Sequence, residues 1–118
     1  MTENRNKSEK LFVIWSSGDR EVATKMVFMY TLNAKRRGWW NDISLIVWGP
    51  SAKLVSEDKA LQAEIKKIKE AGVELMACKA CSDSYGVSDT LEALGIEVKY
   101  MGEPLTQLLK EDHKIITF

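Results

Sequence analysis

The sequence predicts an α/β fold with three layers, in which helices cover both faces of a five-stranded parallel sheet. Two observations lead to this prediction. Five short apolar runs are spread along the chain, and stretches with apolar residues at three- and four-residue spacing lie between them. Strict alternation of strands and helices favours right-handed crossovers, which place helices on the faces of a parallel sheet. The expected order of elements is βαβαβαβαβ.

Length and composition agree with one domain, which we place at residues 1–118. A chain of 118 residues can bury roughly two thirds of the surface that its unfolded form exposes. Hydrophobic residues make up 45% of the chain and charged residues 29%, which is far from the composition of a disordered protein. Residues 1–9 are mostly polar, and we expect them to form a flexible segment ahead of the domain.

The first strand–helix unit covers residues 11–15 and 19–37. The five residues of the strand are apolar and partly β-branched, as in a strand buried on both faces, and the helix carries one apolar stripe. Either Ser17 or Asp19 can cap the amino end of this helix, and Gly38 can end it in the left-handed conformation.

The second unit has a strand at residues 43–48 and a helical face that extends from Leu54 to Gly72, with Asp58 as the expected start of the main helix. The loop at 49–53 is predicted to be a strand-to-helix turn with Ser51 as a cap. This loop lacks the glycines of a phosphate-binding loop, so we expect no nucleotide or other organic cofactor.

The remaining elements follow the same rules. The third strand is predicted at residues 73–77, and Ser88 is expected to cap a short helix that ends at Gly95. A fourth strand at 96–100 and a fifth at 114–118 flank a helix that has Pro104 in its first turn.

Charge and hydropathy argue against two classes of partner. The chain has 17 Lys and Arg residues against 17 Asp and Glu residues, whereas duplex nucleic acid is bound by clustered positive charge. No segment approaches the ~20 apolar residues of a membrane span, and the start of the chain lacks the apolar stretch of a secretory signal. We therefore expect a cytoplasmic protein that binds neither nucleic acid nor a membrane.

Residues 16–19, 48–51, 78–81 and 100–104 are expected to converge at the carboxyl ends of the strands, where crossover loops form crevices and function gathers. Cys78 and Cys81 are therefore the candidate site residues. Cys78 follows the third strand, and residues 79–85 are long enough for a turn or two of helix that Gly86 ends. Unpaired N–H groups at a helix start favour a thiolate, and Lys79 adds positive charge there. Cys81 lies on the same helical face, close enough to resolve a mixed disulfide or to accept sulfur from Cys78.

Packing, metal binding and thioredoxin-like chemistry are competing roles for the two cysteines. Free cysteine is among the most buried residue types, so packing accounts well for Cys81 taken alone. A structural zinc site needs four ligands, and two cysteines with the distant, surface-placed His113 are too few, so we expect no metal. A thioredoxin-like redox centre would place its Cys-x-x-Cys motif after the first strand of its fold, whereas here it follows the third.

Aromatic residues suggest a contact between subunits. Core packing accounts for Trp15 and Trp48, but Trp39 and Trp40 follow the end of the first helix and are expected to be partly exposed. Aromatic residues are enriched at interfaces, so these two residues favour a homo-oligomer.

With these features the sequence resembles the DsrE/DsrF-like family, which includes small sulfur-carrier subunits of the sulfur relay. The resemblance is carried by residues 12–19, 43–51 and 77–81, by the pair Gly86-Val87, and by 115–118. It implies a flavodoxin-like, DsrEFH-like α/β/α fold with five parallel strands. It also implies assembly as a trimer or hexamer.

The resemblance further implies a function. In sulfur-carrier members, a cysteine eight residues before the Gly-Val pair carries a persulfide, and Cys78 occupies that place. The chain is thus expected to be a sulfurtransferase-type carrier that takes sulfane sulfur from a donor protein and passes it to an acceptor. One alternative is a non-catalytic oligomeric module that binds a ligand or partner, favoured by Ser84-Tyr85 in place of the Arg-Arg of carriers. The other is a dithiol redox protein that uses Cys78 and Cys81.

Overall fold

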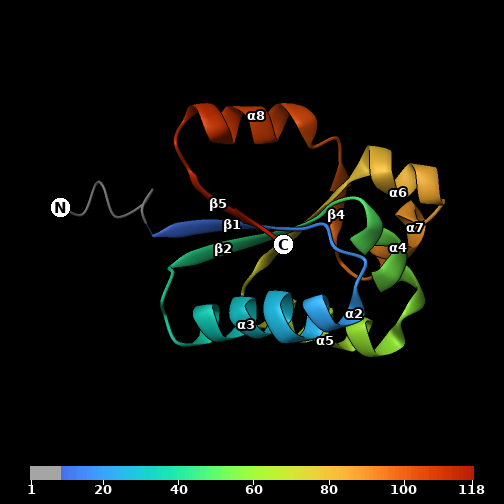
Figure 1. Cartoon of the computed structure of the whole chain (residues 1–118), viewed down its shortest axis with the longest axis horizontal. Helices are drawn as coiled ribbons and strands as arrows, with labels where there is room; N and C mark the ends of the chain where they lie inside the picture. The colour runs from blue at the N-terminus through green and yellow to red at the C-terminus, as the bar shows by residue number, and fades with distance from the viewer. Residues whose placement is uncertain (1–8) are drawn as a thin grey trace.

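The computed structural model describes residues 9–118, which form a single five-stranded sheet (Figure 1). Its strands are β1 (Lys10–Trp15), β2 (Asp42–Val47), β3 (Glu74–Cys78), β4 (Glu97–Lys99) and β5 (Lys114–Thr117). They lie in the order β4-β3-β2-β1-β5, and every neighbouring pair is parallel. The predicted α/β/α fold with five parallel strands is confirmed. The expected flexible segment at 1–9 lies outside the described residues, apart from Glu9.

Strand order decides which face each crossover covers. From β1 to β4 the chain moves across the sheet in one direction, and right-handed crossovers put the longer helices between these strands on one side (Figure 1). The helices between β1 and β4 are α2 (Arg20–Val22), η1 (Ala23–Phe28), α3 (Met29–Arg36), α4 (Pro50–Glu57), α5 (Lys59–Glu70), α6 (Lys79–Tyr85) and α7 (Ser88–Ala93). Of these, α3 and α5 cover one face, whereas α4, α6 and α7 gather at the carboxyl end of the sheet, where α6 begins directly after β3 (Figure 1). The connection from β4 to β5 returns across the sheet through α8 (Gly102–Lys110), which covers the opposite face (Figure 1).

The predicted helix at 19–37 is present, but its middle is a π-helix, η1, which the spacing of apolar residues did not predict. Asp19 is the N-cap, with its Oδ1 accepting hydrogen bonds from the backbone N–H groups of Glu21 and Val22 at 2.7 and 3.1 Å. The wider π-helical turns allow the adjacent residues Val27 and Phe28 both to be buried.

The predictions that Ser51 and Ser88 cap helices are wrong, whereas the predicted cap of α5 by Asp58 is confirmed. Ser88 is the first residue of α7 instead of its cap, and its hydroxyl donates to Asp83. Ser51 lies inside α4, where its hydroxyl donates to the carbonyl of Trp15 and accepts from the N–H of Trp48. Each hydroxyl is occupied by a partner outside its own helix, so neither is free to cap that helix.

Side chains alternate between the two faces of each strand, so the sheet has a hydrophobic core on either face. The larger core lies between the sheet and α3 and α5, and it includes Leu75 and Ala77 of β3. The smaller core lies under α8 and contains the alternate residues of the same strands: Phe12, Ile14, Ile46, Met76 and Cys78, joined by Met101. Cys78 therefore belongs to the α8 face. Within residues 9–118 no helix is long and apolar enough to span a membrane.

Candidate functional site

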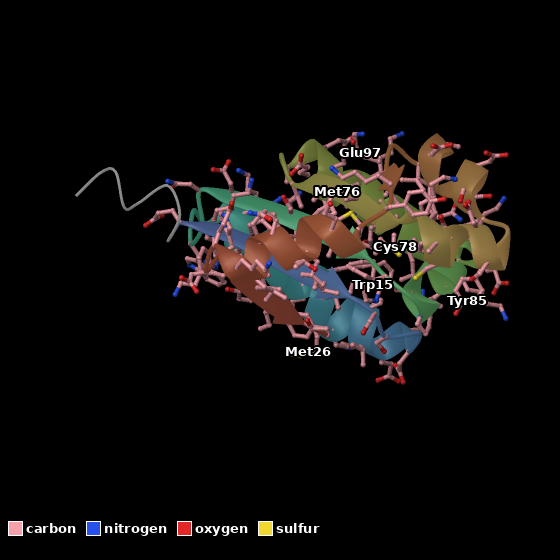
Figure 2. The ribbon with its side chains drawn as sticks, turned by 90° about the horizontal axis from the view of Figure 1, so that it is seen from above. Trp15, Met26, Met76, Cys78, Tyr85 and Glu97 are labelled. Carbon is pink, nitrogen blue, oxygen red and sulfur yellow. The ribbon has the colours of Figure 1, made fainter. Side chains whose placement is uncertain are left out.

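Cys78 stands where β3 ends and α6 begins. It is the last residue of the strand and the N-cap of the helix, with φ −72° and ψ 114°. The residue is 5% exposed and packs in the smaller core with Met76 and Met101, while Trp48 and Cys81 contact this core from its rim. Figure 2 shows Met76 and Cys78 along one line of the sheet, on the face that α8 covers.

Cys81 lies one helical turn further on, is half-buried, and its thiol is hydrogen-bonded to Cys78. Burial raises the pKa of the Cys81 thiol, and the hydrogen bond with Cys78 raises this pKa further, whereas the backbone N–H of Gly49 lowers it. The Cys81 thiol therefore keeps its proton to a higher pH than an unperturbed cysteine does. Its S–H donates toward the Cys78 sulfur. Both cysteines are free.

Lys79 is held beside the two cysteines by two contacts. Its Nζ lies 2.9 Å from Oδ2 of Asp83, one turn along α6, and 5.8 Å from the ring centroid of Tyr100. The Asp83 carboxylate raises the pKa of Lys79, and the hydroxyl of Ser88, which donates to Asp83, is the main cause of a lowered Asp83 pKa. The positive charge of Lys79 is thus paired with Asp83, so it is not available solely to stabilise a thiolate at Cys78.

Two glycines shape the loops around the cysteines. Gly86 ends α6 with φ 70°, as predicted. Gly49 ends the loop after β2 with φ 74°, a left-handed value that turns its N–H toward Cys81. No local sequence signal marks Gly49 as part of the site. Its role arises because the sheet brings the ends of β2 and β3 together.

A shallow hollow of about 230 Å³ lies at the same edge of the sheet. It is bounded by loops and helices that follow three different strands, with Gly18, Pro50 and Tyr85 among the lining residues. The predicted convergence of loops at the carboxyl ends of the strands is therefore present. No group of three or more His, Cys, Asp or Glu side chains in residues 9–118 is arranged to hold a metal ion.

Asp83 and Ser88 join the site without having been predicted, whereas Tyr100 belongs to a segment that was expected at this edge of the sheet. The four-residue spacing of Lys79 and Asp83 was a signal for their ion pair. Tyr100 lies after β4, and nothing local in the sequence indicates that it meets α6. His113 was predicted to lie on the surface, but its side chain is only 18% exposed and packs edge-on against Phe12.

The fold and the site together define a small α/β protein with a pair of thiols at the carboxyl edge of a parallel sheet. Residues 9–118 match the model of the DsrE/DsrF-like family. The chain belongs to this family. No curated protein sequence matches the chain.

Three solved structures share this fold. A conserved protein of unknown function from Bacteroides thetaiotaomicron is 40% identical, with a TM-score of 0.92, and the match covers 94% of this chain and 96% of that one. The ychN protein from E. coli is 18% identical with a TM-score of 0.69, over 93% of this chain and 99% of that one. A protein of unknown function from Methanobacterium thermoautotrophicum is 16% identical with a TM-score of 0.66, over 92% and 97%.

Proposed function

We propose that this protein is a small cytoplasmic sulfur carrier, of the sulfurtransferase type, that accepts and passes sulfane sulfur as a persulfide on Cys78. The observation that supports this most is the position of Cys78 at the junction of β3 and α6, with the Cys81 thiol hydrogen-bonded to it, in a DsrE/DsrF-like fold. No metal or organic cofactor takes part in the proposal.

The chemistry is a thiol exchange between sulfur atoms. The Cys78 thiolate attacks the terminal sulfur of a donor persulfide, R–S–SH, so that a new S–S bond forms on Cys78 and the donor S–S bond breaks. The donor leaves as the thiolate R–S⁻, and Cys78 becomes Cys78–S–SH. An acceptor thiolate then attacks the outer sulfur, and Cys78 returns as a thiolate. Sulfur, protons and electrons balance without an added oxidant or reductant.

The surroundings of Cys78 suit a carried sulfur atom. Met76 and Met101, which are 6% and 1% exposed, pack in the same core as Cys78 and help to exclude water from it. The Cys81 thiol supplies a hydrogen-bond donor. A persulfide in this position is shielded from thiols in solution until a partner gains access to it.

The test is the intact mass after anaerobic exposure to a sulfane-sulfur donor. We expect the unmodified chain and Cys81→Ser to gain about 32 Da, the mass of one sulfur atom, while Cys78→Ser gains nothing. Rapid alkylation with iodoacetamide should label Cys78 before Cys81, since the pKa of Cys81 is raised. Labelling of Cys81 first, or no sulfur uptake by the unmodified chain, would contradict the carrier proposal and favour a binding module that uses the hollow beside Tyr85.

A dithiol redox role is the second candidate, because the two thiols are hydrogen-bonded. Oxidation would join the two sulfurs in a disulfide, with two electrons and two protons passing to a disulfide substrate that is reduced to two thiols. Equilibration with mixtures of reduced and oxidised glutathione measures the reduction potential. A disulfide that forms only at potentials well above the cytosolic range, roughly −220 to −320 mV, would count against this role.

We also propose that the protein is a homo-oligomer, a trimer or a hexamer. Trp39 is 54% exposed, whereas Trp40 is half-buried and donates through Nε1 to the hydroxyl of Tyr30 at 2.9 Å. An exposed tryptophan on so small a chain is typical of a subunit contact. Light scattering at micromolar concentration measures the mass, and a monomer would contradict the proposal.

A further inference from the structure

The two edges of the sheet differ in character. At one edge, β4 has three residues, and its Glu97 and Lys99 form an ion pair at 3.5 Å. A short, charged edge resists pairing with another strand. At the other edge, β5 carries two isoleucines, Ile115 and Ile116. Figure 2 shows Glu97 at the margin formed by β4 and Met26 at the opposite margin, near β5.

The outer edge of β5 has backbone groups available for pairing. Next to β5, the Phe118 N–H donates to the carbonyl of Ile14 at 2.8 Å, and its carbonyl accepts from Ser16 at 2.7 Å. Because the hydrogen-bonding direction alternates along a strand, Ile116 also faces β1, while Ile115 and Thr117 point their N–H and C=O groups outward. Within the described part of the chain, no strand lies beyond β5.

Exposed apolar side chains border this edge, and we call them the β5 patch. Met26, Met29, Trp39 and Ile116 are 49%, 53%, 54% and 42% exposed. They line a hollow of about 470 Å³ together with Tyr30 and Phe118, and Lys25 is the one charged residue among those that line it. Each side chain leaves on the order of 100 Å² open, so the patch exposes on the order of 400 Å².

This area is about half of the ~800 Å² per partner that a standard protein interface buries. The backbone edge of β5 and the polar rim of the hollow supply surface for the remainder. The formal net charge of the chain is zero, so two copies approach without mutual repulsion. An apolar patch beside an open strand therefore fits a second copy of this chain better than a charged partner.

We propose that two copies pair through their β5 strands, antiparallel and about a twofold axis, to form one continuous sheet with five strands from each copy. The outward groups of Ile115 in one copy bond to those of Thr117 in the other. Ile116 then lies opposite its counterpart in a non-hydrogen-bonded pair, with Cα atoms about 4.5 Å apart. The β5 patches of the two copies meet on that face. This inference goes beyond the proposed sulfur transfer and involves neither cysteine.

The test uses substitutions that affect only the proposed contact. Thr117→Pro removes an outward N–H and leaves the pairing of β5 with β1 in place, while Thr117→Val keeps the N–H and is its matched control. Met29→Lys places a charge in the β5 patch, and Leu109→Lys is its control, because Leu109 is 57% exposed on α8 at the other face. Light scattering gives the mass of each variant, and circular dichroism with thermal unfolding shows that it is folded.

A twofold contact has a distinctive signature, since its loss halves the mass. We expect Thr117→Pro and Met29→Lys to turn a dimer into monomers, or a hexamer into trimers, while both control variants keep the mass of the unmodified protein. Folded variants of unchanged mass would overturn the proposal, as would an unmodified protein that is a monomer or a plain trimer. Sulfur uptake is measured separately, so a failure of the carrier proposal leaves this result unaffected.

Discussion

Among single residues, the two cysteines differ most clearly in burial and in hydrogen bonding. Cys78 is 5% exposed, whereas Cys81 is half-buried and donates to it. Exposure alone would make Cys81 the easier thiol to reach. Protonation works in the opposite direction, because the Cys81 thiolate would lose both solvation and its bond to Cys78. Access and the raised pKa of Cys81 therefore act in opposite directions on the order in which the two thiols react.

The first prediction concerns the titration of Cys81. In Cys78→Ala, the hydrogen bond that raises the pKa of Cys81 is gone, but burial, the larger cause, remains. We expect the pKa of Cys81 to fall in this variant and to stay above that of an unperturbed cysteine, near 9.0. Thiolate absorbance in the ultraviolet, followed against pH, measures it. An unchanged pKa would show that the two thiols do not interact.

Among the helices and strands, α6 is a helix of seven residues between β3 and a left-handed glycine. So short a helix is marginal by itself and depends on its ends and its tertiary contacts. Gly86 supplies the C-terminal stop, with φ 70°, and the N–H of Val87 donates back to the carbonyl of Ser82 at 2.8 Å. The geometry of the thiol pair thus depends on a residue five positions beyond Cys81.

The second prediction tests this dependence with two glycines. Gly86→Ala should destabilise the protein by about 1 kcal/mol, since a Cβ in the left-handed region costs roughly 1–2 kcal/mol and no atom lies within 4 Å of it to add a clash. Gly102→Ala, at the start of α8, is the matched control with open space and no positive φ. Chemical denaturation measures both. Equal stability of the two variants would mean that the left-handed turn at Gly86 does not help to hold α6.

In the molecule as a whole, the two faces of the sheet are covered unequally. The face that holds Cys78 is covered mainly by α8, none of whose residues is fully buried, with Cys81 of α6 at its rim. By contrast, α5 contributes Leu61, Ile65 and Ile68, each 0% exposed, to the larger core. Elements with little buried apolar surface open at low free energy. Opening of α8 is therefore the expected route by which a donor reaches Cys78.

The third prediction follows from this difference. Backbone amides of α8 should exchange hydrogen faster than those of α5. Leu105→Ala, which trims the contact of α8 with the smaller core, should weaken docking by about 1 kcal/mol and speed alkylation of Cys78 roughly five-fold. Leu109→Ala is the control, because that side chain is exposed. If Cys78 is alkylated at the same rate in Leu105→Ala and in Leu109→Ala, access to Cys78 does not depend on the docking of α8.

Local sequence patterns were sufficient to predict the elements, their alternation and the candidate cysteines. Apolar periodicity and capping residues such as Asp19 and Asp58 act within a few positions of the chain, so they can be recognised without a structure. Strict alternation then leads to a parallel sheet, and the place of Cys78 at a strand end follows from it. The π-helical turns of η1 were missed, because their insertion is decided by packing against the sheet.

Features that depend on neighbours far apart in the chain emerge only from the folded molecule. The strand order β4-β3-β2-β1-β5 assigns α3 and α5 to one side of the sheet and α8 to the other. It buries Cys78 under α8, brings Gly49 to Cys81 and Tyr100 to Lys79, and leaves β5 as an open apolar edge. These contacts join residues whose local sequence carries no sign of one another, because burial and long-range pairing arise from the whole chain.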